Sequence, residues 1–216
     1  MNVLITLLTG LHPAIRRAYA AGVHEGCGWV ARARPVGEWL EGWRKAAPHP
    51  WAEVFAVVRQ IGEVLVAVER VDVLPTLRSE DVHVGPDGAV QVELTADAAE
   101  RLCRSGMLPY GVMFTSPEEV AGKPRTRGSL QFSLCELAWL TFHRQRPFAG
   151  ESLLESMMAK VEGKWRDPPP ATVLPPKVHL ALVRGLALDP ADRWPSIEAL
   201  LASLAPRRGL FAWLRR

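Results

Sequence analysis

The stretch Ser129–Phe148, with the sequence SLQFSLCELAWLTFHRQRPF, decides how the rest of the chain is organised. Its apolar side chains recur at helical spacing along two stripes, so the predicted helix is apolar nearly all round. Such a helix is favoured only where other elements enclose it. We therefore expect a buried central helix, terminated by Pro147, in a mainly α-helical domain. The two stripes hold Leu130, Leu134, Leu137 and Thr141, and Phe132, Cys135, Trp139 and Phe142.

Length and composition favour a single soluble domain. The chain has 216 residues, of which 48% are hydrophobic and 23% charged, and it contains no run of the roughly 18 apolar residues that a membrane span needs. Its cysteines, Cys27, Cys103 and Cys135, are odd in number and widely spaced. This usage is typical of a reducing, cytoplasmic setting in which thiols pack and do not pair.

The charge is mild and unevenly placed. The formal net charge is +3, and the arginines at positions 207, 208, 215 and 216 of the C-terminal tail exceed it by themselves. The rest of the chain is close to neutral and has no basic stripe with interleaved aromatic residues. We therefore expect no nucleic-acid binding.

The chain around the central stretch predicts further helices and a hairpin. Apolar residues at helical spacing predict a long helix that starts at Pro50 and runs to about Arg70. Alternating residues on both sides of Gly85–Gly88 predict a β-hairpin. The remaining predicted elements are a helix over Met1–Gly10, strands over His12–Ile15 and Tyr19–Ala31 joined by a glycine-bearing turn, a helical turn over Ala96–Leu102, and helices over Pro35–Lys45, Gly150–Trp165, Lys177–Leu188 and Pro195–Leu204.

Three motifs in the second half of the chain resemble those of bacterial-type serine/threonine protein kinases. Phe114–Glu119 (FTSPEE) resembles the Ala-Pro-Glu segment that closes a kinase activation loop, and Ser129–Phe148 resembles the central helix with its Arg-Pro-Phe ending. Gly185–Ser196 (GLALDPADRWPS) resembles the last motif of the family, with its arginine at Arg193. Their order and spacing resemble the kinase C-lobe.

The resemblance implies a mainly α (α+β) fold in three parts. Residues 1–34 would be a remnant of the kinase N-lobe, with the end of helix C, two strands and the hinge. Residues 35–205 would form the C-lobe, and residues 206–216 a basic aromatic tail. On this interpretation the chain begins partway through the N-lobe, after the places of the glycine-rich loop and of the lysine that binds phosphate.

The catalytic positions implied by the resemblance hold residues that do not suit catalysis. Asp81–Val84 matches the Asn-Val-Leu-Val that follows a kinase catalytic loop, which places the catalytic aspartate at Thr76 and its neighbouring lysine at Arg78. The magnesium-binding aspartate falls on Leu94. Threonine cannot act as a base near neutral pH, and leucine cannot coordinate magnesium. Asp81 itself stands in the place of the metal-binding asparagine, either as a cation ligand or as a turn or helix-capping group.

The resemblance also implies one retained structural contact. Glu118 and Arg193 match the ion pair that braces the lower lobe of kinases, and we interpret them as a structural pair, since removing one partner of a buried pair is strongly destabilising. The aspartate that opens the family's central helix bonds the catalytic loop. Leu130 and Pro75 occupy those two places here, so we expect an apolar anchor.

We therefore expect a catalytically inactive pseudokinase, with no cofactor and no metal, that binds a regulatory or signalling protein as a scaffold or adaptor. The alternative is an atypical nucleotide-binding protein kinase with a non-standard active site, using Asp81, Glu80 or Asp97 for metal and Arg78 for phosphate. Single histidines such as His83 and His143 are interpreted as core or surface residues, because no second Cys/His pair stands at zinc spacing.

Three segments are candidates for partner binding. Leu153, Leu154, Met157 and Met158 form an apolar stripe that either docks a partner, as the matching helix often does in kinases, or packs on the central helix. The strands near Ile15–Val30 would have uncovered edges. Residues 207–216, including Trp213, suit weak contact with an anionic surface at the inner face of a membrane, or an acidic partner. For this tail the alternative is a disordered or locally packed end.

Overall fold

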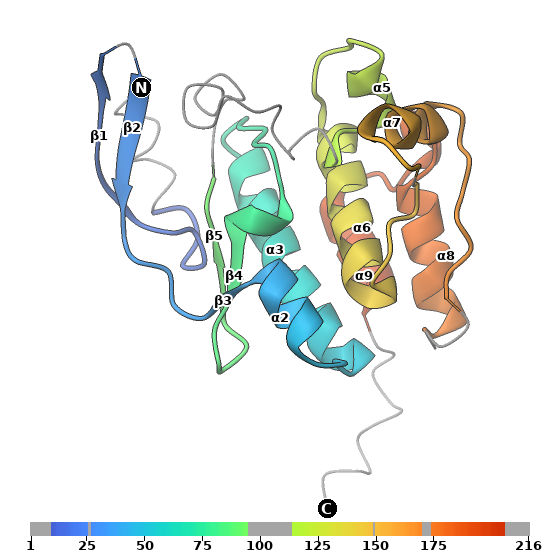
Figure 1. The fold of residues 1–216 in the computed structure, drawn as a ribbon, viewed down its shortest axis with the longest axis horizontal. Coiled ribbons are helices and arrows are strands. Elements are labelled where there is room, and N and C mark those ends of the chain that lie inside the picture. Colours follow the sequence, from blue (N-terminus) through green and yellow to red (C-terminus); the bar gives the residue numbers. More distant parts are fainter. Residues whose placement is uncertain (1–9, 26, 95–113, 149, 170–173, 206–216) are drawn as a thin grey trace, which may run out of the picture.

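The computed structural model describes residues 10–25, 27–94, 114–148, 150–169 and 174–205 (Figure 1). The predicted helices over Met1–Gly10 and Ala96–Leu102 and the tail from residue 206 lie almost wholly outside this part of the chain. In chain order the elements are β1 (Ala18–His24), β2 (Cys27–Arg32), β3 (Glu38–Trp39), α2 (Leu40–Ala46), α3 (Trp51–Glu69), the 3-10 turn η1 (Ser79–Asp81), β4 (Val82–Val84), β5 (Val90–Val92), α5 (Pro117–Val120), α6 (Arg127–His143), α7 (Leu153–Val161), α8 (Pro176–Gly185), the 3-10 turn η3 (Pro190–Asp192) and α9 (Ile197–Leu204).

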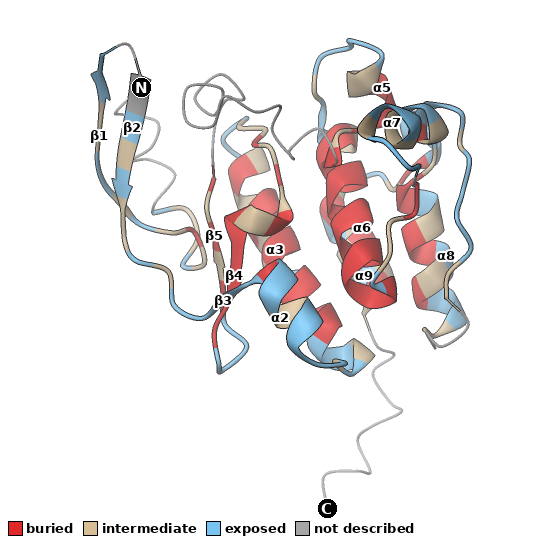
Figure 2. Ribbon diagram, viewed as in Figure 1, coloured by how far each residue is buried: buried red, intermediate tan, exposed pale blue. Residues whose placement is uncertain are grey.

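The central helix is α6, and it is buried as the sequence predicts. Every residue from Ser129 to His143 is buried, and Figure 2 shows the helix enclosed along almost its whole length. Thr126 caps its start, since the Thr126 hydroxyl accepts the amide N–H of Ser129 and the Ser129 hydroxyl accepts that of Thr126. Such a capping box satisfies two amides that the first turn leaves without partners.

The prediction that Pro147 terminates this helix is wrong. The last helical residue is His143, and Arg144 follows in the left-handed conformation with φ of 57°. The amide of Arg144 still donates to the Leu140 carbonyl, 2.9 Å away. A left-handed residue after the last turn is a common way to end a helix, so the chain has already turned before it reaches the proline.

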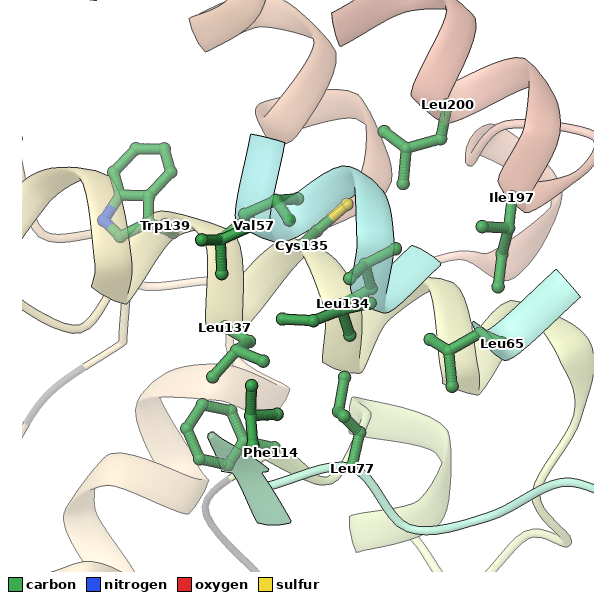
Figure 3. Packing of buried hydrophobic residues seen from close by; sticks show 14 of the residues in the cluster. Val57, Leu65, Leu77, Phe114, Leu134, Cys135, Leu137, Trp139, Ile197 and Leu200 are labelled. Carbon is green, nitrogen blue, oxygen red and sulfur yellow. The ribbon is translucent and has the colours of Figure 1, made fainter. Parts of the chain in front are cut away.

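The core is built where α3, α6 and α9 meet (Figure 3). The long helix α3 confirms its prediction and buries one apolar face. Figure 3 shows Leu65 of this helix near Ile197 of α9, and Val57 further along α3 near Cys135 of α6. Helix α9 approaches α3 closely at Gly62, where a Cβ would lie 2.8 Å from a methyl carbon of Leu201 and would push that side chain aside.

The strands form two separate antiparallel sheets. One contains β1 and β2, and the other has the order β3-β4-β5. The predicted hairpin is β4–β5, and Gly88 at its turn has φ of 76°, which favours glycine. The strand predicted at His12–Ile15 is wrong: Ile15 makes only an isolated parallel bridge to Val92, and the two strands of the first sheet both lie within residues 18–32.

The helix predicted over Pro35–Lys45 is shorter in the structure. It begins at Leu40, which is almost fully buried, while Trp39 belongs to β3 and is 59% exposed. Helix α7 likewise spans only Leu153–Val161 of the predicted Gly150–Trp165. Among the described residues, none of the helices has both the length and the hydropathy required to cross a bilayer.

Candidate functional site

The loop between α3 and η1 contains Thr76, the position predicted for a catalytic base. Arg125 forms hydrogen bonds to this loop. One guanidinium nitrogen of Arg125 donates to the Pro75 carbonyl at 2.7 Å and to the Thr76 hydroxyl at 3.0 Å. Another nitrogen pairs with Glu119 at 2.6 Å. The Thr76 hydroxyl therefore accepts a hydrogen bond from a cation that is already paired with a carboxylate, so the loop is held by a fixed polar contact.

The expectation of an apolar loop anchor, made for Leu130 and Pro75, left out a polar contact. Leu130 is fully buried, but Arg125 supplies a polar anchor to the same loop, and sequence analysis missed it. The only sequence signal was a basic residue shortly before the helix start, which many helices have. Its role depends on a contact between residues far apart in the chain.

Asp81, interpreted from the sequence as a cation ligand or as a turn or helix-capping group, lies in the turn η1 and forms an ion pair with Arg78. Two nitrogens of Arg78 donate to the two carboxylate oxygens of Asp81 at 3.0 and 2.9 Å. Arg78 also lies 3.5 Å from Glu80. The Asp81 side chain is 4% exposed. Burial raises the pKa of Asp81 to about 7, although Arg78 acts in the opposite direction.

Leu94, at the position predicted for the magnesium ligand, is buried and 4% exposed. Its carbonyl accepts a hydrogen bond of 2.9 Å from Arg32, the last residue of β2. The preceding residue, Glu93, pairs with Arg32 at 3.1 Å and with Arg16 at 2.9 Å. Two arginines of the N-terminal segment are thus joined to the chain beside β5.

We define the cleft network as Arg16, Arg32, Arg78, Asp81 and Glu93. Arg78 and Asp81, three residues apart, were candidate site residues, but the pairing of Glu93 with Arg16 and Arg32 was not predicted, because these residues come from separate segments that no local motif links. Within it each carboxylate contacts at least one guanidinium. Among the described residues, no group of three or more His, Cys, Asp or Glu side chains is arranged to hold a metal ion. Through Glu93, the network connects Arg32 of β2 and Arg16 to the residue that follows β5.

We expect the replacement Arg78→Ala to destabilise the fold by about 1–3 kcal/mol at pH 8, because it removes two charge-assisted hydrogen bonds from a buried carboxylate. The loss should be smaller at pH 5. Below the folded-state pKa of about 7, the Asp81 carboxyl is protonated in the native state and needs no cation. Above this pKa the buried carboxylate is ionised, so the loss of Arg78 costs more stability. Urea denaturation at both pH values measures this.

The double variant Arg78→Ala/Asp81→Asn serves as the control for that experiment. Compared with the single variant Asp81→Asn, which also lacks the titrating carboxylate, its loss of stability should be nearly equal at pH 5 and pH 8. An equal loss for Arg78→Ala at the two pH values would contradict the assigned pairing.

Glu118 and Arg193 form the pair that the motifs implied. Two nitrogens of Arg193 donate to the two oxygens of Glu118, both at 2.8 Å, and the Arg193 and Glu118 side chains are 0% and 7% exposed. Arg193 also donates to the backbone carbonyls of Gly128, Ala187 and Leu188. Burial acts to raise the pKa of Glu118, but hydrogen bonds, first of all from Arg193, outweigh it and hold the pKa at about 2.

Helix α7 presents its apolar stripe partly to solvent. Leu154 and Met158 are 66% and 52% exposed, while Leu153 and Met157 are half-buried. The alternative that the whole stripe packs on the central helix is therefore wrong. We define the α7 patch as Leu154, Met158 and Val161, which is 44% exposed. Trp213, the remaining interface candidate, lies outside the described residues.

A buried ion pair attaches α7 to the central helix. Lys160 is the buried residue of α7. Its ammonium group lies 2.8 Å from a carboxylate oxygen of Glu136 in α6 and donates to the Thr115 carbonyl at 2.8 Å. It also lies 5.5 Å from the ring centroid of Phe132. Lys160 is buried in this contact, whereas the three residues of the α7 patch are exposed.

Comparison with known proteins places this geometry in a kinase-like fold. No protein-family model matches the chain. It is 30% identical over 112 residues to tyrosine-protein kinase MasK of Myxococcus xanthus (strain DK1622), a match that covers 50% of this chain and 17% of MasK. The crystal structure of Rad53 1-466 in complex with AMP-PNP matches with a TM-score of 0.75 at 13% identity.

The match to Rad53 covers 94% of this chain and 54% of that chain, so this chain spans only part of either protein. The structural likeness bears out the predicted fold class: a mainly helical α+β, protein-kinase-like fold. The weak sequence match to a bacterial kinase agrees with it.

Proposed function

We propose that this kinase-like chain is a catalytically inactive pseudokinase that binds a regulatory or signalling protein as a scaffold or adaptor. The observation that carries the proposal is the identity of two residues at the old active site, Thr76 and Leu94. Phosphoryl transfer needs an aspartate that orients the attacking hydroxyl and an aspartate that holds magnesium. Neither replacement carries a charge.

The surroundings of these two residues support the same proposal. The Thr76 hydroxyl is bound by Arg125, and the Leu94 carbonyl by Arg32. Asp81, one of the candidate metal ligands, already binds Arg78 through both oxygens. A magnesium ion or a phosphate would have to displace these internal pairs, and displacing a buried charge partner costs several kcal/mol.

The alternative, an atypical nucleotide-binding kinase, gains no support from the described residues. It requires a cation that binds phosphate, and its candidate, Arg78, is paired with Asp81 and lies 3.5 Å from Glu80. Asp97, a further metal candidate, lies outside the described residues.

An assay of phosphoryl transfer tests the inactive state directly. The purified chain, incubated with radiolabelled ATP, magnesium or manganese, and mixed protein substrates, should incorporate no more label than a heat-denatured sample. The variant Thr76→Ala should behave identically, since the threonine is proposed to do no chemistry. Incorporation above the denatured control, by either protein, would overturn the proposal.

The α7 patch is the surface proposed for the partner. We expect the double variant Leu154→Glu/Met158→Glu to lose at least ten-fold in partner binding, because charges would enter an apolar interface. Both side chains are more than half exposed, so unfolding free energy should change by no more than about 0.5 kcal/mol per site. Cross-linked affinity capture with quantitative mass spectrometry compares the proteins bound.

The matched control for that experiment is Val36→Glu. Val36 is 58% exposed, close to the value for Leu154, and lies before β3 rather than on α7. It should retain the partners of the unmodified protein. If the α7 variant captures the same proteins in the same amounts as the control, the α7 patch is not the interface.

A further inference from the structure

A pocket of about 740 Å³ lies away from the old active site, between α2, α3 and the turn of the β4–β5 hairpin. Three acidic side chains line it, Glu38, Glu53 and Asp87, together with the indole of Trp43. No lysine or arginine of the described residues is part of the lining. We call this feature the acidic pocket.

The three carboxylates of the acidic pocket lack a lysine or arginine partner in the described part of the chain. Elsewhere on the same helices exposed carboxylates are paired: Glu41 lies 2.7 Å from Lys45, and Glu63 lies 2.9 Å from Arg59. In the pocket, Glu53 contacts the imidazole of His49 at 3.2 Å, and Asp87 accepts the amide of Ala89. Among the described residues, no lysine or arginine therefore neutralises the carboxylates of the pocket.

The walls of the pocket are held in place before any ligand binds. The side chain of Gln60 on α3 donates to the Gly88 carbonyl at 2.9 Å and accepts the Val90 amide at 3.0 Å. The Trp43 ring is stacked on His49 with ring centroids 3.7 Å apart. A preformed site with an aromatic surface beside carboxylates suits a guanidinium, which binds carboxylates in two places and stacks on aromatic rings.

The chain itself carries a segment of the matching chemistry. Residues 206–216, PRRGLFAWLRR, contain four arginines, no acidic residue, and the aromatic side chains of Phe211 and Trp213. This segment follows Ala205 at the end of α9. Its charge is opposite to that of the acidic pocket.

The course of α9 directs the segment towards the end of the molecule that holds the acidic pocket. Ile197 lines one cavity with Val66, and Leu201 packs at Gly62, so α9 runs antiparallel to α3 towards its N-terminal half. In Figure 1 the end of α9 lies on the same side of the molecule as the α2–α3 connection and the β4–β5 turn. Eleven residues reach at most about 36–40 Å when extended, well beyond the diameter of a helix, about 10–12 Å.

We propose that the segment 206–216 docks in the acidic pocket of its own chain, with an arginine side chain between the carboxylates and the Trp43 ring. This interaction goes beyond the scaffold role and is independent of it. It would also compete with the binding of the same arginines to an anionic membrane surface.

The rate at which trypsin cleaves the native full-length chain after Arg207 and Arg208 tests the proposal. A docked segment is protected, so the pocket variant Glu38→Gln/Glu53→Gln/Asp87→Asn should be cleaved at least five times faster than the unmodified protein. The control variant Glu25→Gln/Glu151→Gln/Asp167→Asn removes the same charge from exposed positions elsewhere and should be cleaved at the unmodified rate. Equal rates for the pocket variant and the unmodified protein would overturn the proposal.

Carbodiimide cross-linking of the full chain with Arg208→Lys and Arg215→Lys identifies the site. The introduced amines should link to Glu38, Glu53 or Asp87 within one chain, independently of protein concentration. Links found only in covalent dimers would assign the pocket to a second copy. Vesicles of phosphatidylserine should sediment the pocket variant more strongly than the unmodified protein, and equal sedimentation would mean that the segment is not docked. Either of these last outcomes contradicts the proposal.

Discussion

Replacing Arg193 by alanine is expected to destabilise the fold by about 3–5 kcal/mol, the cost of leaving one partner of a buried ion pair alone. The guanidinium is fully buried and donates to both oxygens of Glu118 and to three backbone carbonyls. Its loss would leave the Glu118 carboxylate and these carbonyls in the interior without their donor. Urea denaturation followed by circular dichroism measures the change in unfolding free energy.

The control for Arg193→Ala is Arg59→Ala. Arg59 also pairs with a glutamate, but its side chain is 51% exposed, so its loss should cost less than about 0.5 kcal/mol. A loss of under about 1 kcal/mol for Arg193→Ala would contradict the bracing role, since a surface pair alone accounts for that much.

The same pair gives the stability a defined dependence on pH. The folded-state pKa of Glu118 is about 2, below its ordinary value of 4.5. The unfolded chain therefore binds the proton first, and the contribution of Glu118 to stability is present above about pH 4.5 and is lost as pH falls towards 2. In Glu118→Gln this part of the acid dependence should disappear.

The second large effect is expected at the contact between α7 and α6. Lys160→Met should cost about 3–5 kcal/mol near neutral pH, because it leaves the buried carboxylate of Glu136, whose side chain is 1% exposed, without its cation. Burial already raises the pKa of Glu136, so protonation at lower pH should reduce the cost. Denaturation curves at pH 7 and pH 5 test both statements.

A double variant separates the ion pair from simple packing. Lys160→Met/Glu136→Leu replaces both charges by apolar side chains of similar size, and such replacements are often neutral or stabilising. Its stability should recover most of the loss seen in Lys160→Met. If the double variant is as unstable as the single one, the cost arises from packing and not from the unpaired carboxylate.

The helical part of the fold was predictable because its signals are local. A segment apolar on every side, Ser129–His143, has to be enclosed, and the structure confirms it. Helix α3 and the β4–β5 hairpin follow equally from residue spacing and a glycine-bearing turn. The helix end at Arg144 was not predictable, since a left-handed arginine has no sequence signature.

The candidate site was predictable only where motifs set the register. They located Thr76, Leu94 and the pair of Glu118 with Arg193. The pairing of Glu93 with Arg16 and Arg32 escaped prediction because these residues meet only after the N-terminal segment packs beside β5. The attachment of α7 through Lys160 also escaped prediction, because a lysine on an amphipathic helix is normally expected at the surface.

The thermal unfolding midpoint with and without millimolar magnesium-ATP tests most directly whether the region around Thr76 and Leu94 binds a nucleotide. An inactive chain without a nucleotide site should unfold at the same midpoint in both conditions. Specific binding at 100 times the dissociation constant would add about 2.7 kcal/mol to the folded state, and each kcal/mol raises the midpoint of a chain of this size by about 2–4 °C. A magnesium-dependent rise of that size would contradict the proposal that this kinase-like chain is inactive.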